Sequence, residues 1–237
     1  MSFRGHSLLA VVPARGGSVG IPGKNLKRVR GLSLVARAAR AVLETGLADR
    51  AICSTDDQAI AEEAKRHGLD VPELRPAELS GSLARSVDVW AHVWRDIERR
   101  DGQRYEFSIL IEPTSPLRRP EDIEATLSGL LKANACAAAT VSPTPAHYTP
   151  HKTLTLNSEG RIGFYLQDGA RFALRQSIPS YYHRNGVCYA ARRETVVERG
   201  QILEEDCVAV ILDRPLVNID EPFDLELAEF LAAREAW

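Results

Sequence analysis

A glycine-rich segment near the start of the chain combines backbone freedom with positive charge. It reads Pro-Ala-Arg-Gly-Gly-Ser-Val-Gly-Ile-Pro-Gly-Lys-Asn over residues 13–25. Glycine lets backbone N–H groups approach an anion closely, and the side chains of Arg15 and Lys24 add positive charge. The segment lacks both the Gly-Lys-Ser/Thr ending of a Walker loop and the GxGxxG spacing of a dinucleotide site. It therefore predicts a phosphate-binding loop of another kind. A plain glycine-rich turn is the alternative.

The elements around this loop alternate between strand and helix over the first 140 residues. Apolar runs predict strands at 7–12, 50–54, 107–111 and 135–141, and helical signals predict helices at 33–46, 57–67 and 121–132. Val87, Trp90, Trp94 and Ile97 recur at helical spacing and predict a further helix that faces the core. Repeated units of this kind indicate an α/β fold, with a mainly parallel sheet flanked by helices.

Three polar blocks follow three of these predicted strands. The glycine-rich loop follows 7–12, Ser-Thr-Asp-Asp at 54–57 follows 50–54, and Glu-Pro-Thr-Ser-Pro-Leu-Arg at 112–118 follows 107–111. Parallel sheets bind ligands beyond the carboxyl ends of their strands, so we expect the blocks to form one site. Within the second block, Asp56 is expected to fix the loop and Asp57 to favour the next helix N-terminus. Metal ligation by this pair is the alternative.

The alternation breaks in the second half of the chain. Residues 142–182 are rich in Pro, His, Tyr and Gly, and we interpret 143–183 as an inserted, β-rich arm. The main fold is expected to resume with strands at 186–191, 208–212 and 216–219 and to close with a helix at 223–234. The sequence is thus interpreted as one domain over 1–237 that carries a small arm.

Composition excludes several functional classes. The 237 residues carry a net charge of −2 with both signs interspersed, which argues against a nucleic-acid-binding or membrane surface. The four cysteines are isolated, which predicts reduced thiols rather than disulfides or a zinc site. The first apolar run, 8–12, is too short for a signal peptide or a membrane span. A cytoplasmic location is the resulting expectation.

The blocks together resemble one known family. The loop at 13–25 is similar to the signature loop of the CMP-sialic acid synthetases (N-acylneuraminate cytidylyltransferases), and the similarity continues in order through the blocks at 54–57, 74–79, 112–118, 184–186 and 218–220. The resemblance implies a Rossmann-like, glycosyltransferase-A-like fold. It also implies transfer of CMP from CTP to a nine-carbon, sialic-acid-like 2-keto-3-deoxy sugar acid, in surface polysaccharide biosynthesis.

The resemblance also implies a set of site residues. It assigns nucleotide binding to Arg15, Gly16, Gly17, Ser18, Lys24, Asn25, Arg75 and Ser86, with Arg15, Lys24 and Asp220 as the catalytic residues. It assigns Mg²⁺ binding to Asp220 and Asn218, in keeping with the preference of this cation for oxygen ligands. It assigns sugar binding to Glu112, Lys152, Arg175 and Arg184, since a cation must meet the sugar carboxylate. It further implies a homodimer joined through the arm.

Several positions depart from the family pattern, among them Ser82 and Leu83, which stand where an Asp-Thr pair is common in relatives. Three further departures change charge. Val19 stands where relatives have lysine, Asn218 where they have a second aspartate, and Glu112 where they have glutamine. Each change alters the charge beside the triphosphate, the metal or the sugar. Two alternatives therefore stay open: a nucleotide-binding homologue with weak or lost turnover, and an enzyme similar to CMP-Kdo synthetase, although the latter has a different loop.

Overall fold

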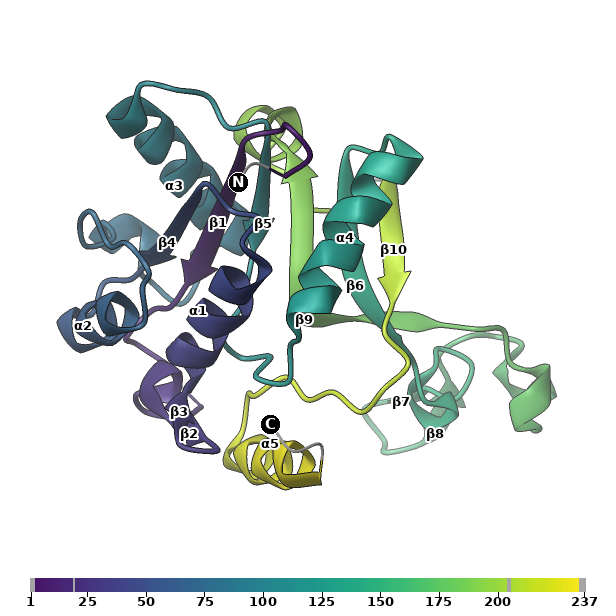
Figure 1. Cartoon of the computed structure of the whole chain (residues 1–237). Coiled ribbons are helices and arrows are strands. Elements are labelled where there is room, and N and C mark those ends of the chain that lie inside the picture. The colour runs from purple at the N-terminus through teal and green to yellow at the C-terminus, as the bar shows by residue number, and fades with distance from the viewer. Residues whose placement is uncertain (1–2, 19, 204–205, 235–237) are drawn as a thin grey trace. The chain divides into compact units, whose positions relative to one another are not determined.

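The computed structural model describes residues 3–18, 20–203 and 206–234. Its strands are β1 Leu8–Pro13, β2 Arg28–Val29, β3 Leu32–Ser33, β4 Arg50–Ser54, β5 Phe107–Leu110, β6 Ala137–Pro143, β7 Leu154–Leu156, β8 Ile162–Phe164, β9 Tyr182–Arg192 and β10 Cys207–Ile211. Its α-helices are α1 Leu34–Thr45, α2 Gln58–Arg66, α3 Ser86–Asp101, α4 Pro120–Ala133 and α5 Pro222–Arg234 (Figure 1).

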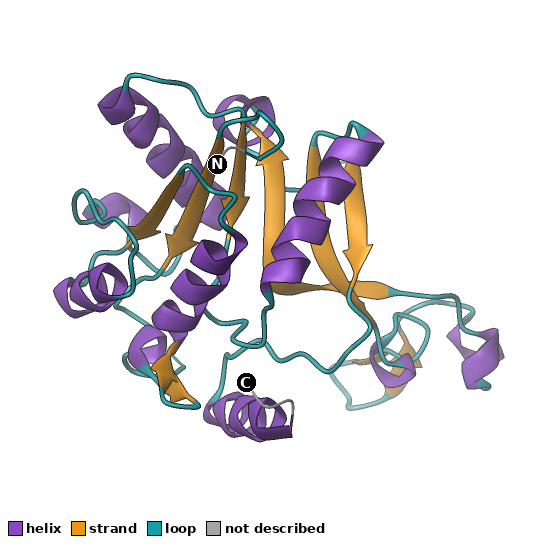
Figure 2. Cartoon of the chain, in the orientation of Figure 1, coloured by secondary structure: helices purple, strands orange, loops and turns teal. Residues whose placement is uncertain are grey.

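A six-stranded mixed sheet forms the centre of the fold, with the order β10-β6-β9-β5-β1-β4 (Figure 2). β1 pairs in parallel with β4 and with β5, whereas β9 pairs antiparallel with β5. The mainly parallel sheet predicted from the sequence is therefore confirmed. Because β1, β4 and β5 are parallel, the three polar blocks that follow them leave the sheet at the same edge.

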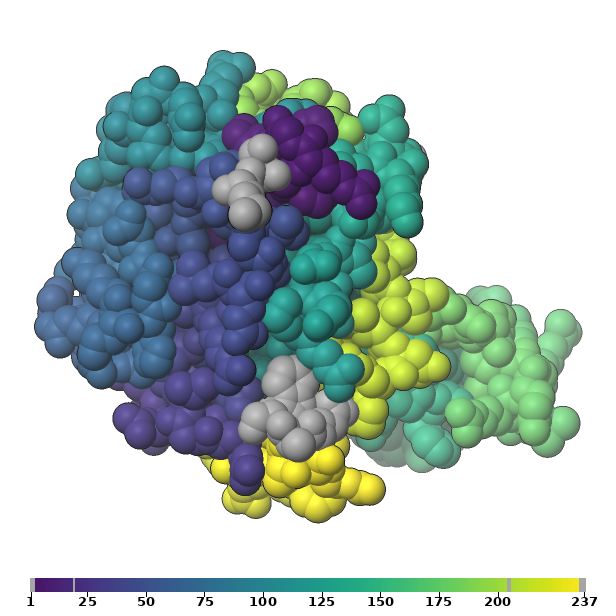
Figure 3. Space-filling view, viewed as in Figure 1, coloured from purple at the N-terminus to yellow at the C-terminus, as the bar shows by residue number. Residues whose placement is uncertain are grey.

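Helices cover both faces of this sheet, and the central strands β1 and β5 are apolar and buried on both sides. Leu9 and Val11 of β1 pack in one core cluster with Trp90 and Trp94 of α3. The two indole rings are fully buried, with ring centroids 6.1 Å apart, which confirms the predicted core stripe. On the other face, α1 and α4 lie side by side (Figure 3).

Local sequence signals set the helix ends. Ser33 accepts a hydrogen bond from the Ala36 N–H at the start of α1, and Gly46, at φ +61°, ends that helix. Asp57 accepts bonds from two N–H groups at the start of α2. Both caps are the residues expected from the sequence, since short polar side chains satisfy the first free N–H groups of a helix.

One predicted strand is wrong. Residues 216–219 form no strand, and the backbone bond recorded there joins the Ile219 N–H to the Thr114 carbonyl at 2.8 Å. Val217 and Ile219 are nevertheless buried, packed with residues of α5. Val217 and Ile219 are apolar because they pack beneath α5, and not because they belong to the sheet.

The chain divides into two compact units. The larger contains 1–140, 185–210 and 215–237. The smaller, which we call the arm unit, contains 141–184 and 211–214 and includes the β7–β8 hairpin. Inside the arm unit, the His151 ring lies 3.9 Å from the Phe172 ring and hydrogen-bonds the Tyr181 hydroxyl at 3.1 Å. The predicted role of the arm in dimerisation stays a prediction.

Two features bear on expectations from composition. Cys53 and Cys188 are buried, Cys136 and Cys207 are partly exposed, and none of these four described cysteines forms a disulfide. In the described part of the chain, every helix is too short or too polar to cross a membrane.

Candidate active site

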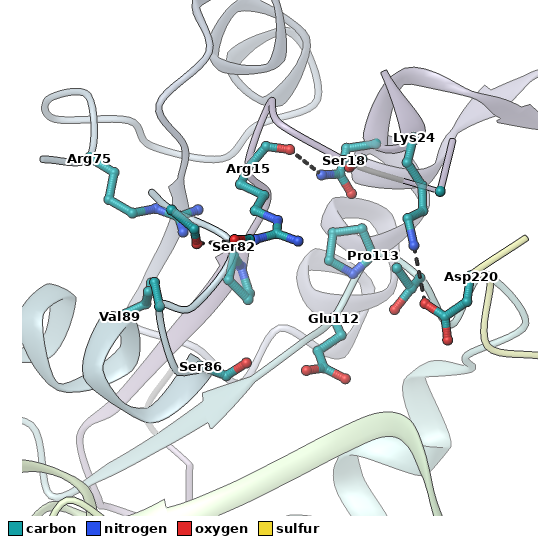
Figure 4. A pocket seen from close by; sticks show the side chains of 16 residues that line it. Arg15, Ser18, Lys24, Arg75, Ser82, Ser86, Val89, Glu112, Pro113 and Asp220 are labelled. Atoms are coloured by element: carbon teal, nitrogen blue, oxygen red, sulfur yellow. Dashed lines mark hydrogen bonds and ion pairs between the residues drawn. The ribbon is translucent and has the colours of Figure 1, made fainter. Parts of the chain in front are cut away.

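A cavity of about 410 Å³ opens at the sheet edge where the polar blocks converge. Eight of the predicted site residues line it: Arg15, Ser18, Lys24, Asn25, Arg75, Ser86, Glu112 and Asp220 (Figure 4). All of them belong to the larger unit. The structure therefore brings residues that span more than 200 positions of the sequence into one pocket.

The glycine-rich loop is held from both sides. The Asn25 side chain is buried and donates to the Arg15 carbonyl at 2.9 Å, while Asp56 accepts from the Gly16 N–H at 2.9 Å. The predicted loop-fixing role of Asp56 is therefore confirmed. Gly20 comes closest to another segment, since a Cβ built there would lie 2.5 Å from the Asp220 carbonyl oxygen. A glycine is thus required at Gly20 for close backbone approach.

Two arginines lie together at one end of the pocket (Figure 4). Arg15 donates to the Gly81 carbonyl at 3.1 Å, and Arg75 donates to the Ser54 carbonyl at 2.5 Å. Burial lowers the pKa of Arg75, Asp56 raises it, and the nearby Arg15 charge lowers it. Among the described residues, the buried Nε of Arg75 has no hydrogen-bond partner. The two guanidinium groups therefore repel each other weakly, and an anion between them would relieve this repulsion.

A lysine and an aspartate face each other on the opposite side. Lys24 Nζ donates to the Ile219 carbonyl at 2.8 Å and lies 3.2 Å from Asp220 Oδ1. The lysine side chain is largely buried, whereas that of Asp220 is 73% exposed. The Asp220 carboxylate therefore already attracts a cation at the rim of the pocket.

Glu112 lies between these two ends, at the start of the loop that follows β5 (Figure 4). Its carboxylate is close to the backbone of β9, because a Cβ built on Gly186 would lie 2.9 Å from Glu112 Oε2. The same Cβ would lie 3.7 Å from Asn218 Nδ2. Two of the positions that depart from the family pattern, Glu112 and Asn218, therefore face the same glycine.

The other predicted residues, including the predicted metal ligand Asn218, are not among the described residues that line this cavity. Gly16 and Gly17 belong to the same loop, with the Gly16 N–H directed to Asp56. Lys152, Arg175 and Arg184 belong to the arm unit, where Lys152 Nζ donates to the Ala173 carbonyl at 3.1 Å. Val19 lies outside the described residues.

The structure adds lining residues that the sequence did not single out as functional. Gly81 and Ser82 come from the loop before α3, and Pro113 and Thr114 extend the wall beside Glu112. The sequence could have indicated Pro113 and Thr114, because they belong to the block at 112–118 that follows β5 directly. In the loop at 81–82, the one signal was the departure of Ser82 from the family pattern, and Gly81 carried none.

Comparisons with known proteins identify the family of the chain. A family model described as cytidylyltransferase matches residues 9–214. CMP-N,N'-diacetyllegionaminic acid synthase of Legionella pneumophila is 28% identical over 94% of this chain and 95% of its own. Pseudaminic acid cytidylyltransferase of Campylobacter jejuni is 27% identical, with 94% and 95% covered.

A solved structure supports the fold. The structure of CMP:2-keto-3-deoxy-manno-octonic acid synthetase complexed with CTP matches with a TM-score of 0.71 and 19% identity, and the match covers 97% of this chain and 99% of the other. The family model covers most of the chain, including the loop, the blocks after β4 and β5 and the arm unit. The chain is a member of the cytidylyltransferase family.

Proposed function

We propose that the protein transfers CMP from CTP to a nine-carbon 2-keto-3-deoxy sugar acid of the legionaminic, pseudaminic and sialic acid class. The observation that carries this proposal is the single pocket in which three cations and two carboxylates converge, in a chain similar along its length to synthases of such CMP-sugars. The anomeric hydroxyl of the sugar acid attacks the α-phosphorus of CTP. The bond from that phosphorus to the β-phosphate breaks, and pyrophosphate leaves.

The cations of the pocket are suited to a triphosphate. Arg15 and Lys24 line the cavity from the glycine-rich loop and Arg75 lines it from the block at 74–79, so they can meet phosphate oxygens from several directions. Catalysis of phosphoryl transfer depends mostly on positioning and on neutralising charge, which is what fixed guanidinium groups supply.

The residues beside Asp220 fit a magnesium ion. Mg²⁺ is usually held by one or two carboxylates together with substrate phosphates. Asp220 supplies such a carboxylate, and its side chain is 73% exposed at the rim, where a hydrated cation can reach it beside Lys24. In the described residues, no group of three or more His, Cys, Asp or Glu side chains converges. A bound Mg²⁺ would supply charge neutralisation at the phosphates, with Asn218 adding a neutral oxygen.

The sugar acid must be bound by other side chains. Glu112 lines the pocket as a carboxylate and repels phosphates, so it is suited to the hydroxyl and amide donors of a sugar. Lys152, Arg175 and Arg184 are proposed to meet the sugar carboxylate, since bidentate arginine suits that group. These assignments rest on the resemblance of the chain to its family.

A pyrophosphate-release assay tests the proposal. The protein is incubated with Mg²⁺, one nucleoside triphosphate and one of four acceptors: N-acetylneuraminate, legionaminate, pseudaminate or 2-keto-3-deoxy-octonate. We expect release with CTP and a nine-carbon acid, and little with UTP or ATP. Preference for the eight-carbon acid would favour the CMP-Kdo synthetase alternative. CTP binding without any release would favour the binding-only alternative.

A further inference from the structure

Arg118 is a fully buried arginine that lies close to the pocket without lining it. Its side chain is 3% exposed. Its Nε donates to the Val187 carbonyl, and one terminal nitrogen donates to the carbonyls of Glu112 at 2.6 Å and Gly186 at 3.2 Å. One guanidinium therefore joins the loop after β5 to the backbone of β9.

The position of these contacts explains why an arginine stands there. The recorded pairing of β5 with β9 ends at Leu110 and Tyr189, and the chain then turns away at Pro113. Beyond this point Arg118 bridges the two segments in place of the strand ladder. Burial lowers the pKa of Arg118 to about 10, so the group stays charged at neutral pH. Its planar fork reaches three carbonyls at once, which the point charge of a lysine cannot do.

The Glu112 carboxylate lies where the two segments that Arg118 joins come together. On one side, Arg118 fixes the backbone of Glu112 itself. On the other, Gly186 at φ +69° leaves room for that carboxylate, since a Cβ would lie 2.9 Å from its Oε2 and 2.8 Å from Ser115 Oγ. Ser115 adds a second tie by donating to the Asn185 carbonyl at 2.8 Å. The direction of the Glu112 side chain therefore depends on the Arg118 bridge.

We propose that Arg118 is a positioning residue that sets the acceptor side of the pocket by holding Glu112 against Gly186. This inference rests on the proposed transfer to a sugar acid. The Glu112 carboxylate repels the triphosphate and is therefore assigned to the sugar acid. Displacement of Glu112 should then weaken binding of the sugar acid and leave CTP binding nearly unchanged. Arg118 thus acts on one substrate although it touches neither.

The test compares Arg118→Lys with Arg192→Lys as a matched control. Arg192 also donates to a backbone carbonyl, that of Ala135 at 3.0 Å, but it lies at the far end of β9 from the pocket. For each variant, KM is measured separately for CTP and for the sugar acid, with kcat and the unfolding temperature. Hydrogen exchange of peptides covering 111–118 is followed in parallel.

For Arg118→Lys we expect the KM of the sugar acid to rise about 10-fold or more and that of CTP to change less than about threefold. Exchange in 111–118 should quicken, and Arg192→Lys should show neither effect. A fall in kcat and unfolding temperature with both KM values unchanged would show a merely structural role and overturn the proposal, as would a rise confined to CTP.

Two further outcomes are decided separately. If Arg118→Lys does not fold, Ser115→Ala is tested in its place, because it removes only the neighbouring hydrogen bond to the Asn185 carbonyl. This variant should raise the KM of the sugar acid and leave that of CTP unchanged. KM values equal to those of the wild type would overturn the proposal. If the wild type releases no pyrophosphate with any acceptor, the proposed function fails. Exchange in 111–118 then decides the role of Arg118, and unchanged exchange in the variant rejects it.

Discussion

At the scale of single residues, the pocket is organised by contacts between segments far apart in the sequence. Lys24 and Asp220 are 196 positions apart, yet they form an ion pair at the rim. Gly20 lies against the backbone of Asp220 so closely that no side chain fits between them. The glycine-rich loop and the proposed metal ligand are therefore packed directly against each other, and changes to either should disturb the other.

Asp220→Ala is expected to lower magnesium-dependent turnover by about 100-fold or more, since a metal ion supplies several kcal/mol of charge stabilisation in such reactions. The fold should survive because the side chain is 73% exposed. Pyrophosphate release against Mg²⁺ concentration and thermal unfolding measure the two effects. Glu226→Ala, which removes an exposed carboxylate of α5, is the control. Near-normal activity of Asp220→Ala would place the metal elsewhere.

Gly20→Ala is expected to raise the KM for CTP by about 10-fold, because small displacements of positioning groups are costly in transfer reactions. The added methyl group would meet the Asp220 carbonyl at 2.5 Å, so the loop must shift. Gly163→Ala, in the β7–β8 hairpin, is the control, since a Cβ there meets only Thr155 Oγ1, at an ordinary contact distance of 3.4 Å. Steady-state kinetics with CTP varied separate the variants. Equal KM values for both would contradict the proposed close packing.

At the scale of elements, the site depends on where strands end and helices begin. β1, β4 and β5 end at one sheet edge because they are parallel. After β4, Asp56 binds the Gly16 N–H and Asp57 caps α2. Two adjacent aspartates thus connect the glycine-rich loop to the start of a helix. Their side chains are occupied by backbone donors, which favours the structural interpretation of this block over metal ligation.

Asp57→Ala is expected to lower the free energy of unfolding by about 1 kcal/mol, the usual effect of losing an N-cap. The Asp57 carboxylate accepts from the Ala59 N–H at 2.8 Å and from the Ile60 N–H at 3.0 Å. Urea unfolding measures the change, and Asp57→Asn, which keeps a capping oxygen, should recover most of it. If the alanine and asparagine variants lose equal stability, the cap is not the cause.

At the scale of the whole molecule, the arm unit carries apolar side chains on its surface. Tyr148 is 78% exposed, Leu156 72%, Ile162 68% and Leu174 70%. Their own unit does not bury them, and large exposed apolar patches usually mark interaction surfaces. A twofold contact between two copies buries the same patch twice and is the commonest arrangement. We therefore propose that the protein is a homodimer joined through its arm.

Sedimentation at micromolar concentration should show a species of twice the monomer mass. If the arm also completes the partner's site, a mixture of inactive Arg15→Ala and Arg175→Ala chains should regain part of the activity. Ile162→Asp should shift the equilibrium to monomers by placing a charge on the exposed hairpin. A wild-type monomer in sedimentation would rule out the dimer. A dimer without complementation would retain the contact and reject the shared site.

The sequence by itself determined the types of most elements and the residue types that the glycine-rich loop brings to the pocket. Apolar runs, capping residues such as Ser33 and Asp57, and terminal glycines act within a few positions, so they can be recognised locally. The order of blocks along the chain indicated the family. Most of the pocket lining followed, because parallel strands bring their carboxyl ends together.

Only the tertiary structure decided which distant groups meet. It showed that 216–219 packs under α5 and is not a strand. The sequence could not decide this, because burial under a helix and pairing in a sheet produce the same apolar pattern. The tertiary structure placed Lys24 against Asp220, and it placed the buried Arg118 across the loop after β5 and the backbone of β9. These contacts depend on the order of the strands in the sheet. Strand order is set by long-range packing, and no local pattern records it.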